Sequence, residues 1–331
     1  MSHKINEYWR LFRREISLIL NGQKFLERKT IPAGVKKILW LAPSLQNIGD
    51  SVMSLSGRAL LKGQFQLDLV VNEKNLPLFA RDNVFNKVYT DPKQIDESYD
   101  LILLYCVKSI TLKMKRRYFS KIPYCHFRSH FDGIEFNWIL YSFHRINALL
   151  NYPYNQAQID QLARPTLCIP DLIEYNSLRV IVAVGGEDIR RRTYEHWEPI
   201  LEQMLNVRQD LDICLLGNSN GQEMAGKLLS RFGRKISNNV GQHNLLSAAS
   251  LIKNSGYFLG CDGGLMHIAS AFELRGVALF GFFEPEYRLP YNSNLDAFFD
   301  KQSVNLINPQ EVASAFLRKL EQVKENAAIT N

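Results

Sequence analysis

The chain has 331 residues, 46% of them hydrophobic, and a formal net charge of +7, which is enough for two domains with substantial cores. The moderate positive charge points to acidic or phosphorylated partners, and no nucleic-acid partner is expected. No apolar run approaches the ~18 residues that span a bilayer, and the N-terminus lacks the features of a signal peptide. Five scattered cysteines without a CxxC pair suggest buried thiols in a cytoplasmic protein.

Residues 1–30 form a basic, amphipathic arm in which apolar residues such as Trp9, Phe12 and Ile16 alternate with arginines. This pattern is typical of a helix that packs on the body of a protein. The alternative is a helix that lies on an anionic membrane surface through residues 1–22.

Residues 31–170 are predicted to form an N-terminal Rossmann-like domain, because apolar runs alternate there with helical patterns. Such runs indicate a parallel sheet covered on both faces. Strands are expected at 37–42, 67–71, 87–89 and 101–105. Helices are expected from about Ser51 and over about 133–150, and the proline-bearing stretch 152–171 suits a linker.

Residues 171–308 repeat this architecture as a second Rossmann-like domain, with strands at 180–184, 212–216, 258–261 and 277–281. A helix over 309–331, with Asn308 as N-cap and Pro309 in its first turn, is expected to pack back towards the N-terminal domain. The fold class is therefore α/β, and ligands should bind in a cleft between the carboxyl ends of the two sheets.

Three loops at successive strand ends of the second domain have chemistry that suits a nucleotide diphosphate. The first places Gly185 and Gly186 before Arg190, Arg191 and Arg192, whose guanidinium groups bind phosphate in bidentate fashion. The second leads to Glu223 in a first helical turn, where a carboxylate accepts from sugar hydroxyls or merely complements the helix dipole.

The third loop is Asp262-Gly263-Gly264, after which a helix starts with Leu265 and carries His267 in its first turn. Backbone N–H groups at a helix start receive an anion. In the first domain, Asp50 lies at a similar turn between strand and helix, where it is either an N-cap or a general base.

Other motifs point away from metal and dinucleotide chemistry. Asp210-Leu211-Asp212 has the DxD spacing of some metal-dependent sugar transferases, but it precedes a strand and should lie at the far end of the sheet. His126 and His130 have HxxxH spacing without an evident third ligand. The GxGxxG and P-loop signatures are absent, which argues against a dehydrogenase and an NTPase. No metal site and no cofactor are expected.

The segment 262–271, followed by Val277-Ala278-Leu279-Phe280-Gly281, resembles the D-[ST]-G-x-x-H block of the bacterial ADP-heptose:lipopolysaccharide heptosyltransferases, glycosyltransferase family 9. The loop 46–50, Gln-Asn-Ile-Gly-Asp, looks like their N-terminal N-I-G-D loop, and 241–252 is similar to a third family segment. The resemblance implies a GT-B fold and inverting, metal-independent transfer of heptose from ADP-heptose to the lipopolysaccharide inner core. It also implies a cytoplasmic enzyme, peripheral on the inner face of the inner membrane.

Carried over by position, Asp50 matches the catalytic base, Glu223 the ribose-holding acid, and Asp262 and His267 donor-site residues. The family's phosphate-binding lysine has no lysine counterpart in this chain, and one of Arg190, Arg191 or Arg192 occupies its neighbourhood. Gly263 stands where the family has Ser or Thr. The lipid-linked acceptor is anionic, so Asn47 and the basic stretch 107–131 are expected to bind it. The basic residues concerned are Lys113, Lys115, Arg116, Arg117 and Lys121.

Three alternatives stay open from the sequence. One is a glycosyltransferase of the same fold with another donor or acceptor, including a protein acceptor. A second is a catalytically silent protein that binds nucleotide sugars, and a third is a nucleotide-sugar epimerase.

Overall fold

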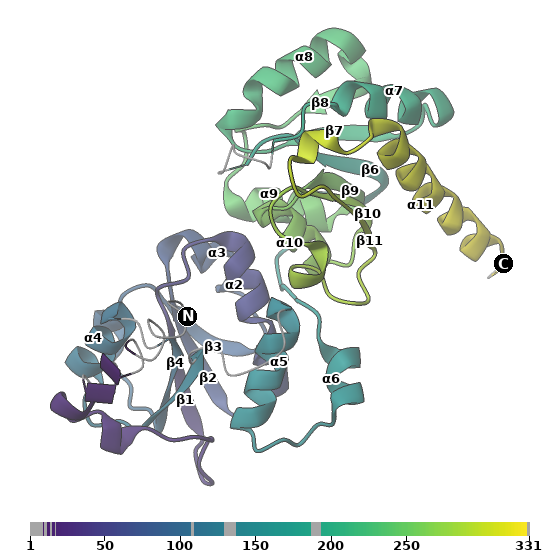
Figure 1. Cartoon of the computed structure of the whole chain (residues 1–331). Coiled ribbons are helices and arrows are strands. Elements are labelled where there is room, and N and C mark those ends of the chain that lie inside the picture. Colours follow the sequence, from purple (N-terminus) through teal and green to yellow (C-terminus); the bar gives the residue numbers. More distant parts are fainter. Residues whose placement is uncertain are drawn as a thin grey trace. The chain divides into compact units, whose positions relative to one another are not determined.

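The computed structural model describes residues 9, 12, 13, 15, 16, 18–106, 109–128, 137–186 and 193–329, with the side chains of 109, 128 and 322–329 left out. The chain divides into two compact units, Met1–Ala163 and Arg164–Asn331 (Figure 1). The boundary therefore falls after Ala163, earlier than the residue 170 expected from the proline-bearing stretch. Each unit has its own parallel sheet and its own hydrophobic core.

The N-terminal unit contains a five-stranded parallel sheet in the order β3-β2-β1-β4-β5. The strands are β1 (Lys37–Ala42), β2 (Gln66–Val71), β3 (Phe85–Tyr89), β4 (Leu101–Cys106) and β5 (Tyr124–Arg128). The helices are α2 (Ile48–Ser54), α3 (Leu76–Phe79), α4 (Ser109–Tyr118), α5 (Trp138–Leu149) and α6 (Gln156–Leu162). The four predicted strands are confirmed, whereas β5 was not predicted because it is short and follows a strongly basic helix.

Alternation along β1 explains how the sheet of this unit is covered on both faces. Leu39 and Leu41 pack with residues of α4 in one apolar cluster. Trp40 points to the other face, where its ring meets Phe127 at 5.2 Å, and Phe127 in turn meets Tyr141 of α5. Since successive side chains of a strand point to opposite faces, an all-apolar strand requires helices on both sides.

The C-terminal unit contains a six-stranded parallel sheet in the order β11-β10-β9-β6-β7-β8. The strands are β6 (Asn176–Ala183), β7 (Asp212–Leu216), β8 (Ile236–Asn238), β9 (Ser255–Cys261), β10 (Arg275–Phe280) and β11 (Leu295–Phe299). The helices are α7 (Trp197–Val207), α8 (Gln222–Phe232), α9 (Leu245–Lys253), α10 (Gly264–Ala271) and α11 (Pro309–Ile329). Counted from β6, this is the Rossmann order 3-2-1-4-5-6, and the order reverses between β6 and β9.

The last helix, α11, is anchored in the core of the C-terminal unit. The start is as predicted, since Asn308 Oδ1 accepts from the Gln310 N–H at 3.0 Å. Its apolar stripe joins the core of the C-terminal unit through Val312, Phe316 and Leu320, and Tyr257 packs on Phe316. These side chains anchor the first half of α11 to its own unit, and the packing of the helix towards the N-terminal domain stays a prediction.

The cysteines are free, as expected, but Cys168 is exposed and Cys261 is only partly buried, so the prediction of buried thiols holds for three of the five. Among the described residues, no helix is long and apolar enough to cross a membrane.

Candidate functional site

The carboxyl ends of β6 and β9 form the centre of the candidate site in the C-terminal unit. Ala183 pairs with Gly260, so Gly185 and Asp262 each follow two residues later on adjacent strands. Ligands of doubly wound sheets bind outside the carboxyl ends of the strands where the order reverses. Gly185 and Asp262 therefore both lie at the strand ends where the order reverses.

The glycines of the β6 and β7 loops allow the two backbones to touch. A Cβ atom on Gly185 would lie 2.6 Å from the Gly221 backbone nitrogen, and one on Gly217 would lie 2.9 Å from the Gly185 nitrogen. A Cβ on Gly186 would meet nothing within 4 Å. Gly185 is thus required for packing between loops, while Gly186 faces open space, and Asn220 Nδ2 donates to its carbonyl oxygen at 2.9 Å.

Asp262 and His267 meet at the start of α10. The Nε2 atom of His267 lies 3.5 Å from Oδ1 of Asp262, and both side chains are almost fully buried. The Asp262 N–H continues the sheet by donating to the Leu279 carbonyl oxygen at 2.8 Å. The strand fixes the carboxylate, the first helical turn fixes the imidazole, and their pairing orients both groups at the strand ends.

Gly263 is the N-cap of α10 and lacks a side chain to cap it. Its φ of 176° is ordinary extended backbone, and an added Cβ would have its nearest neighbour 3.8 Å away at the Cys261 carbonyl oxygen. Neither conformation nor space therefore requires glycine here. The N–H groups of Gly264 and Leu265 follow in the first turn, where an anion is favoured.

Glu223 lies in the first turn of α8, after β7, on the other side of β6 from Asp262. Its side chain is exposed and pairs with Lys227 at 2.7 Å, which lowers the pKa of the carboxyl group. The start of α8 is also joined to the loop after β8, because Gln222 Nε2 donates to the Val240 carbonyl oxygen at 2.6 Å. Arg190, Arg191 and Arg192 lie outside the described residues.

In the N-terminal unit, Asp50 lies in the first turn of α2, after β1. Asn47 is the N-cap residue, so the N-cap alternative for Asp50 is wrong. The Nδ2 group of Asn47 donates to Oδ2 of Asp50 at 3.1 Å. Asn75, which was not singled out in the sequence, anchors this turn by donating to the Leu45 carbonyl oxygen and to Ser51 Oγ. Asn47 and Asp50 therefore lie in contact at a helix start that Asn75 anchors.

The basic residues expected to bind the acceptor divide into two groups. Lys113, Arg116, Arg117 and Lys121 are exposed. Lys115 is 0% exposed, and its Nζ group donates to Gln23 Oε1 and to the Ser120 carbonyl oxygen. The acceptor-binding prediction for Lys115 is wrong in this structure, because the side chain is turned inward to hold the arm.

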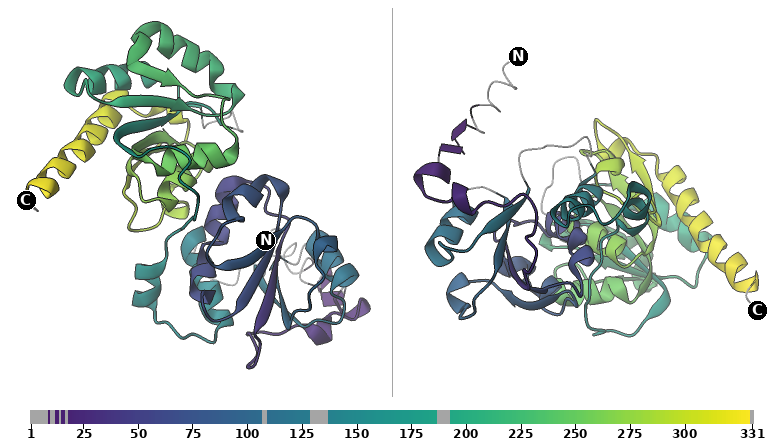
Figure 2. Two further views of the ribbon diagram at one scale, coloured as in Figure 1. Left: turned by 180° about the vertical axis from the view of Figure 1, so that it is seen from behind. Right: turned by 90° about the horizontal axis from the view of Figure 1, so that it is seen from below.

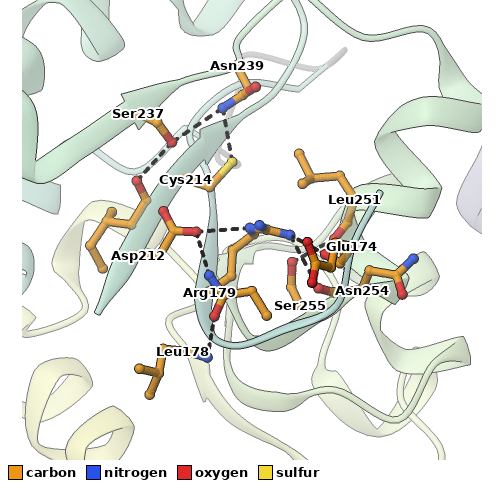
Figure 3. A network of polar contacts seen from close by, with 12 residues as sticks. Glu174, Leu178, Arg179, Asp212, Cys214, Ser237, Asn239, Leu251, Asn254 and Ser255 are labelled. Atoms are coloured by element: carbon orange, nitrogen blue, oxygen red, sulfur yellow. Dashed lines mark hydrogen bonds and ion pairs between the residues drawn. The ribbon is translucent and has the colours of Figure 1, made fainter. Parts of the chain in front are cut away.

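The DxD motif lies at the amino-terminal end of β7, at the end of the sheet opposite the candidate site. Its two carboxylates are already engaged by other side chains, as Figure 3 shows for Asp212. Oδ2 of Asp212 accepts from Arg179 Nε at 3.0 Å and from Asn176 Nδ2 at 2.9 Å. Asp210 pairs with Arg208 through two contacts of 2.7 and 2.8 Å. An arginine therefore pairs with each acid, and both acids lie at the amino-terminal end of β7, away from the candidate site.

His126 also has a structural partner. Its Nε2 atom lies 2.9 Å from Glu27 Oε1, and this contact together with Lys24 lowers the pKa of Glu27 to about 2. His130 lies outside the described residues. Within the described ranges, no group of three or more His, Cys, Asp or Glu side chains is arranged to hold a metal ion.

The loop after β10 is a feature that was not predicted from the sequence. Arg288 is buried there, with its guanidinium carbon 3.8 Å from the centre of the Phe283 ring. The loop follows β10, which is the neighbour of β9 in the sheet. The run Gly281-Phe282-Phe283-Glu284-Pro285 after an apolar strand was the available signal.

Comparison with known proteins identifies this architecture. The profile of glycosyltransferase family 9 (heptosyltransferase) matches residues 187–310. A lipooligosaccharide heptosyltransferase 2 from Haemophilus ducreyi is 25% identical over 300 residues, covering 77% of this chain and 86% of the relative.

Two solved structures share the fold. A family 9 glycosyltransferase from Veillonella parvula has a TM-score of 0.69 at 11% identity, covering 88% of this chain and 99% of that one. The E. coli ADP-heptose lps heptosyltransferase II has a TM-score of 0.65 at 17% identity, covering 87% and 99%. The two parallel-sheet units are those of a GT-B glycosyltransferase, and the chain is an enzyme of this class. More narrowly, residues 187–310 match the model of glycosyltransferase family 9, and the chain is heptosyltransferase-like.

Proposed function

We propose that this glycosyltransferase transfers a heptose from ADP-heptose to the inner core of a lipopolysaccharide or lipooligosaccharide, with inversion and without a metal. The observation that carries the proposal is the buried Asp262–His267 pair at the start of α10, at the reversal point of the C-terminal sheet. The names of the Haemophilus relative and of the E. coli structure support the choice of sugar and acceptor class.

The donor would bind along the carboxyl ends of β9, β6 and β7. The N–H groups at the start of α10 receive the diphosphate, and the open face of Gly186 leaves room for it. Glu223 is exposed and held only by a surface ion pair, which is worth little, so its carboxylate is free to exchange Lys227 for ribose hydroxyls. The Arg190–Arg192 cluster supplies positive charge for the diphosphate.

The transfer step needs a base and a stabilised leaving group. Asp50 takes the proton of an acceptor hydroxyl while the hydroxyl oxygen attacks the anomeric carbon, and the bond from that carbon to the diphosphate breaks. ADP leaves with the bonding electron pair. The helix start and the arginines stabilise the charge that develops on the diphosphate, which replaces the role of a metal. Asn47, which donates to Asp50, holds the carboxylate in place.

The acceptor in this proposal is an anionic, lipid-linked oligosaccharide at the inner face of the inner membrane. The exposed Lys113, Arg116, Arg117 and Lys121 provide positive charge on the same unit as Asp50. Another donor or acceptor, including a protein, is the competing assignment. A catalytically silent protein would bind the nucleotide sugar and release no ADP.

A nucleotide-sugar panel tests the donor by thermal shift. Since a ligand that binds only the folded state stabilises it by RT ln(1 + [L]/Kd), ADP-heptose at 100 times its Kd should add about 2.7 kcal/mol. For a domain the size of the C-terminal unit, Arg164–Asn331, that raises Tm by roughly 5–10 °C. Asp262→Asn should lose the shift, whereas Asp210→Asn, at the opposite edge of the sheet, should keep it.

A larger shift with UDP- or GDP-sugars than with ADP-heptose would overturn the donor assignment. ADP release measured with a lipooligosaccharide acceptor, with and without EDTA, then tests transfer and metal independence. Loss of activity in EDTA that added Mg²⁺ restores would contradict the metal-free mechanism.

A further inference from the structure

The arm presents an apolar stripe to solvent. The described residues between 9 and 20 are helical, and Trp9, Phe12, Ile16 and Ile19 follow the i, i+3, i+7, i+10 spacing of one helix face. Trp9 and Phe12 are each 56% exposed and their rings meet edge to face at 5.9 Å, while Leu20 is 79% exposed. Leu18 points the other way and is fully buried in the core of the N-terminal unit.

Helix α4 lies beside the arm and presents a cationic face. Lys113, Arg116 and Arg117 are exposed, and Lys121 follows just after the helix. Within the described residues, none of these four side chains forms an ion pair. Ile110, one turn before Lys113, is also exposed, whereas Leu112 and Phe119 face the core.

A buried connection fixes the arm to α4. Lys115 reaches from α4 to Oε1 of Gln23, and Nε2 of Gln23 donates to the Ser120 carbonyl oxygen at 3.4 Å. Lys115 Nζ also lies 5.0 Å from the centre of the Tyr124 ring. The end of the arm next to Gln23 lies beside α4 (Figures 1 and 2), so the apolar stripe and the cationic face adjoin at that end.

We propose that these two elements form one docking surface for an anionic lipid bilayer, here named the arm–α4 surface. Its members are the apolar residues Trp9, Phe12, Ile16, Ile19 and Leu20 and the basic residues Arg13, Lys113, Arg116, Arg117 and Lys121. An exposed apolar helix face flanked by cations matches the interface of a membrane with negatively charged head groups. A second copy of the chain is disfavoured as the occupant, because pairing the surface with itself would bring its cations together.

This inference deepens the proposed function, since an enzyme with a lipid-linked acceptor works at a bilayer. The exposed basic residues of α4, which the proposed function gives to the anionic acceptor, also meet head-group phosphates on this surface. Lys115 has a different part: it is a positioning residue that aligns the arm with α4. Each Lys or Arg near an anionic surface contributes about 1 kcal/mol, so removing three should weaken binding by up to ~100-fold.

Co-sedimentation of the full chain with vesicles tests the proposal. The wild type should bind vesicles of phosphatidylcholine with 30% phosphatidylglycerol at least tenfold more tightly than pure phosphatidylcholine, and less tightly as salt increases. Phe12→Ser/Ile16→Ser/Ile19→Ser and Lys113→Gln/Arg116→Gln/Arg117→Gln should each lose at least tenfold. All six side chains are exposed, so both variants should keep the wild-type Tm.

Matched controls alter the same chemistry elsewhere on the surface. Lys62→Gln/Lys93→Gln/Lys235→Gln removes three exposed charges, and Leu162→Ser/Leu172→Ser/Val207→Ser removes three exposed apolar side chains. Both controls should bind like the wild type. Vesicle binding should also shift the Trp9 emission to the blue, and Trp9→Leu should abolish that change.

Three results would overturn the proposal: equal binding to neutral and anionic vesicles, wild-type binding by either arm–α4 variant, or an equal loss in the controls. A dimer in light scattering that the arm variant converts to a monomer, with no vesicle binding, would show that a second copy covers the stripe. The donor thermal shift is measured without lipid, so failure of the proposed function and failure of membrane docking are distinguished.

Discussion

The position of Gly263 allows the contribution of one hydroxyl group to be measured. Replacing it with serine places an Oγ at the N-cap of α10, next to the N–H groups proposed to bind the diphosphate. The backbone tolerates the change, because φ is 176° and the nearest atom to a new Cβ is 3.8 Å away. Gly263→Ala is the matched control, since it adds the Cβ and leaves out the hydroxyl.

The magnitudes follow from capping and from hydrogen bonding to charge. Serine is a better N-cap than glycine by a few tenths of a kcal/mol, and alanine is worse than serine by about 1 kcal/mol. In a domain the size of the C-terminal unit the serine variant should therefore melt roughly 2–4 °C above the alanine variant. A hydrogen bond to a charged group contributes about 1.5–3 kcal/mol, so the serine variant should bind ADP about 10- to 150-fold more tightly than the alanine variant.

Differential scanning fluorimetry gives the two melting temperatures, and isothermal titration with ADP gives the two dissociation constants. Equal ADP affinities for the serine and alanine variants, with the expected difference in Tm, would show that the hydroxyl caps the helix but does not reach the donor. Equal values in both measurements would refute the assignment of position 263 as the N-cap of α10.

The other predictions concern the N-terminal unit. Asp50→Asn should reduce turnover by ~10² or more with little change in Tm, and near wild-type turnover would remove Asp50 as the general base. Arg58→Met should destabilise the unit by about 3–5 kcal/mol in chemical denaturation, because it leaves Asp82 buried without its ion-pair partner, and Arg58→Met/Asp82→Leu should recover most of the loss. If the double variant is no better than the single one, desolvation of Asp82 is not the cause. Burial lowers the pKa of Lys115 from 10.5 to about 8, so the unfolded chain binds more protons than the folded one between these values. The stability of the wild type relative to Lys115→Met should thus increase as pH rises from about 8 to 10.5 and stay constant below pH 7. The whole change is at most roughly 3 kcal/mol. If denaturant curves gave the same difference in unfolding free energy between wild type and variant at pH 7 and at pH 10, the prediction would be contradicted.

The sequence by itself determined the two parallel sheets and most of the strands at their centres. Runs such as Leu101–Cys106 are apolar at every position, and only a strand covered on both faces accommodates that pattern. Helix starts were also determined locally, because Asn244 and Asn308 cap the first turn with their own side chains. The order Asp-Gly-Gly with His in the next turn likewise placed Asp262 and His267 together.

Tertiary structure decided which polar residues are turned inward and which remain at the surface. Lys113, Lys115 and Arg116 look alike in the sequence, but Lys115 is fully buried because the arm brings Gln23 onto α4. Gly185 looked like a ligand-binding glycine, yet the close approach that requires it is to Gly221, 36 positions further along the chain. Such contacts depend on which segments far apart in the sequence pack together. Hydrophobic periodicity is a local pattern, so it does not say which distant segments meet.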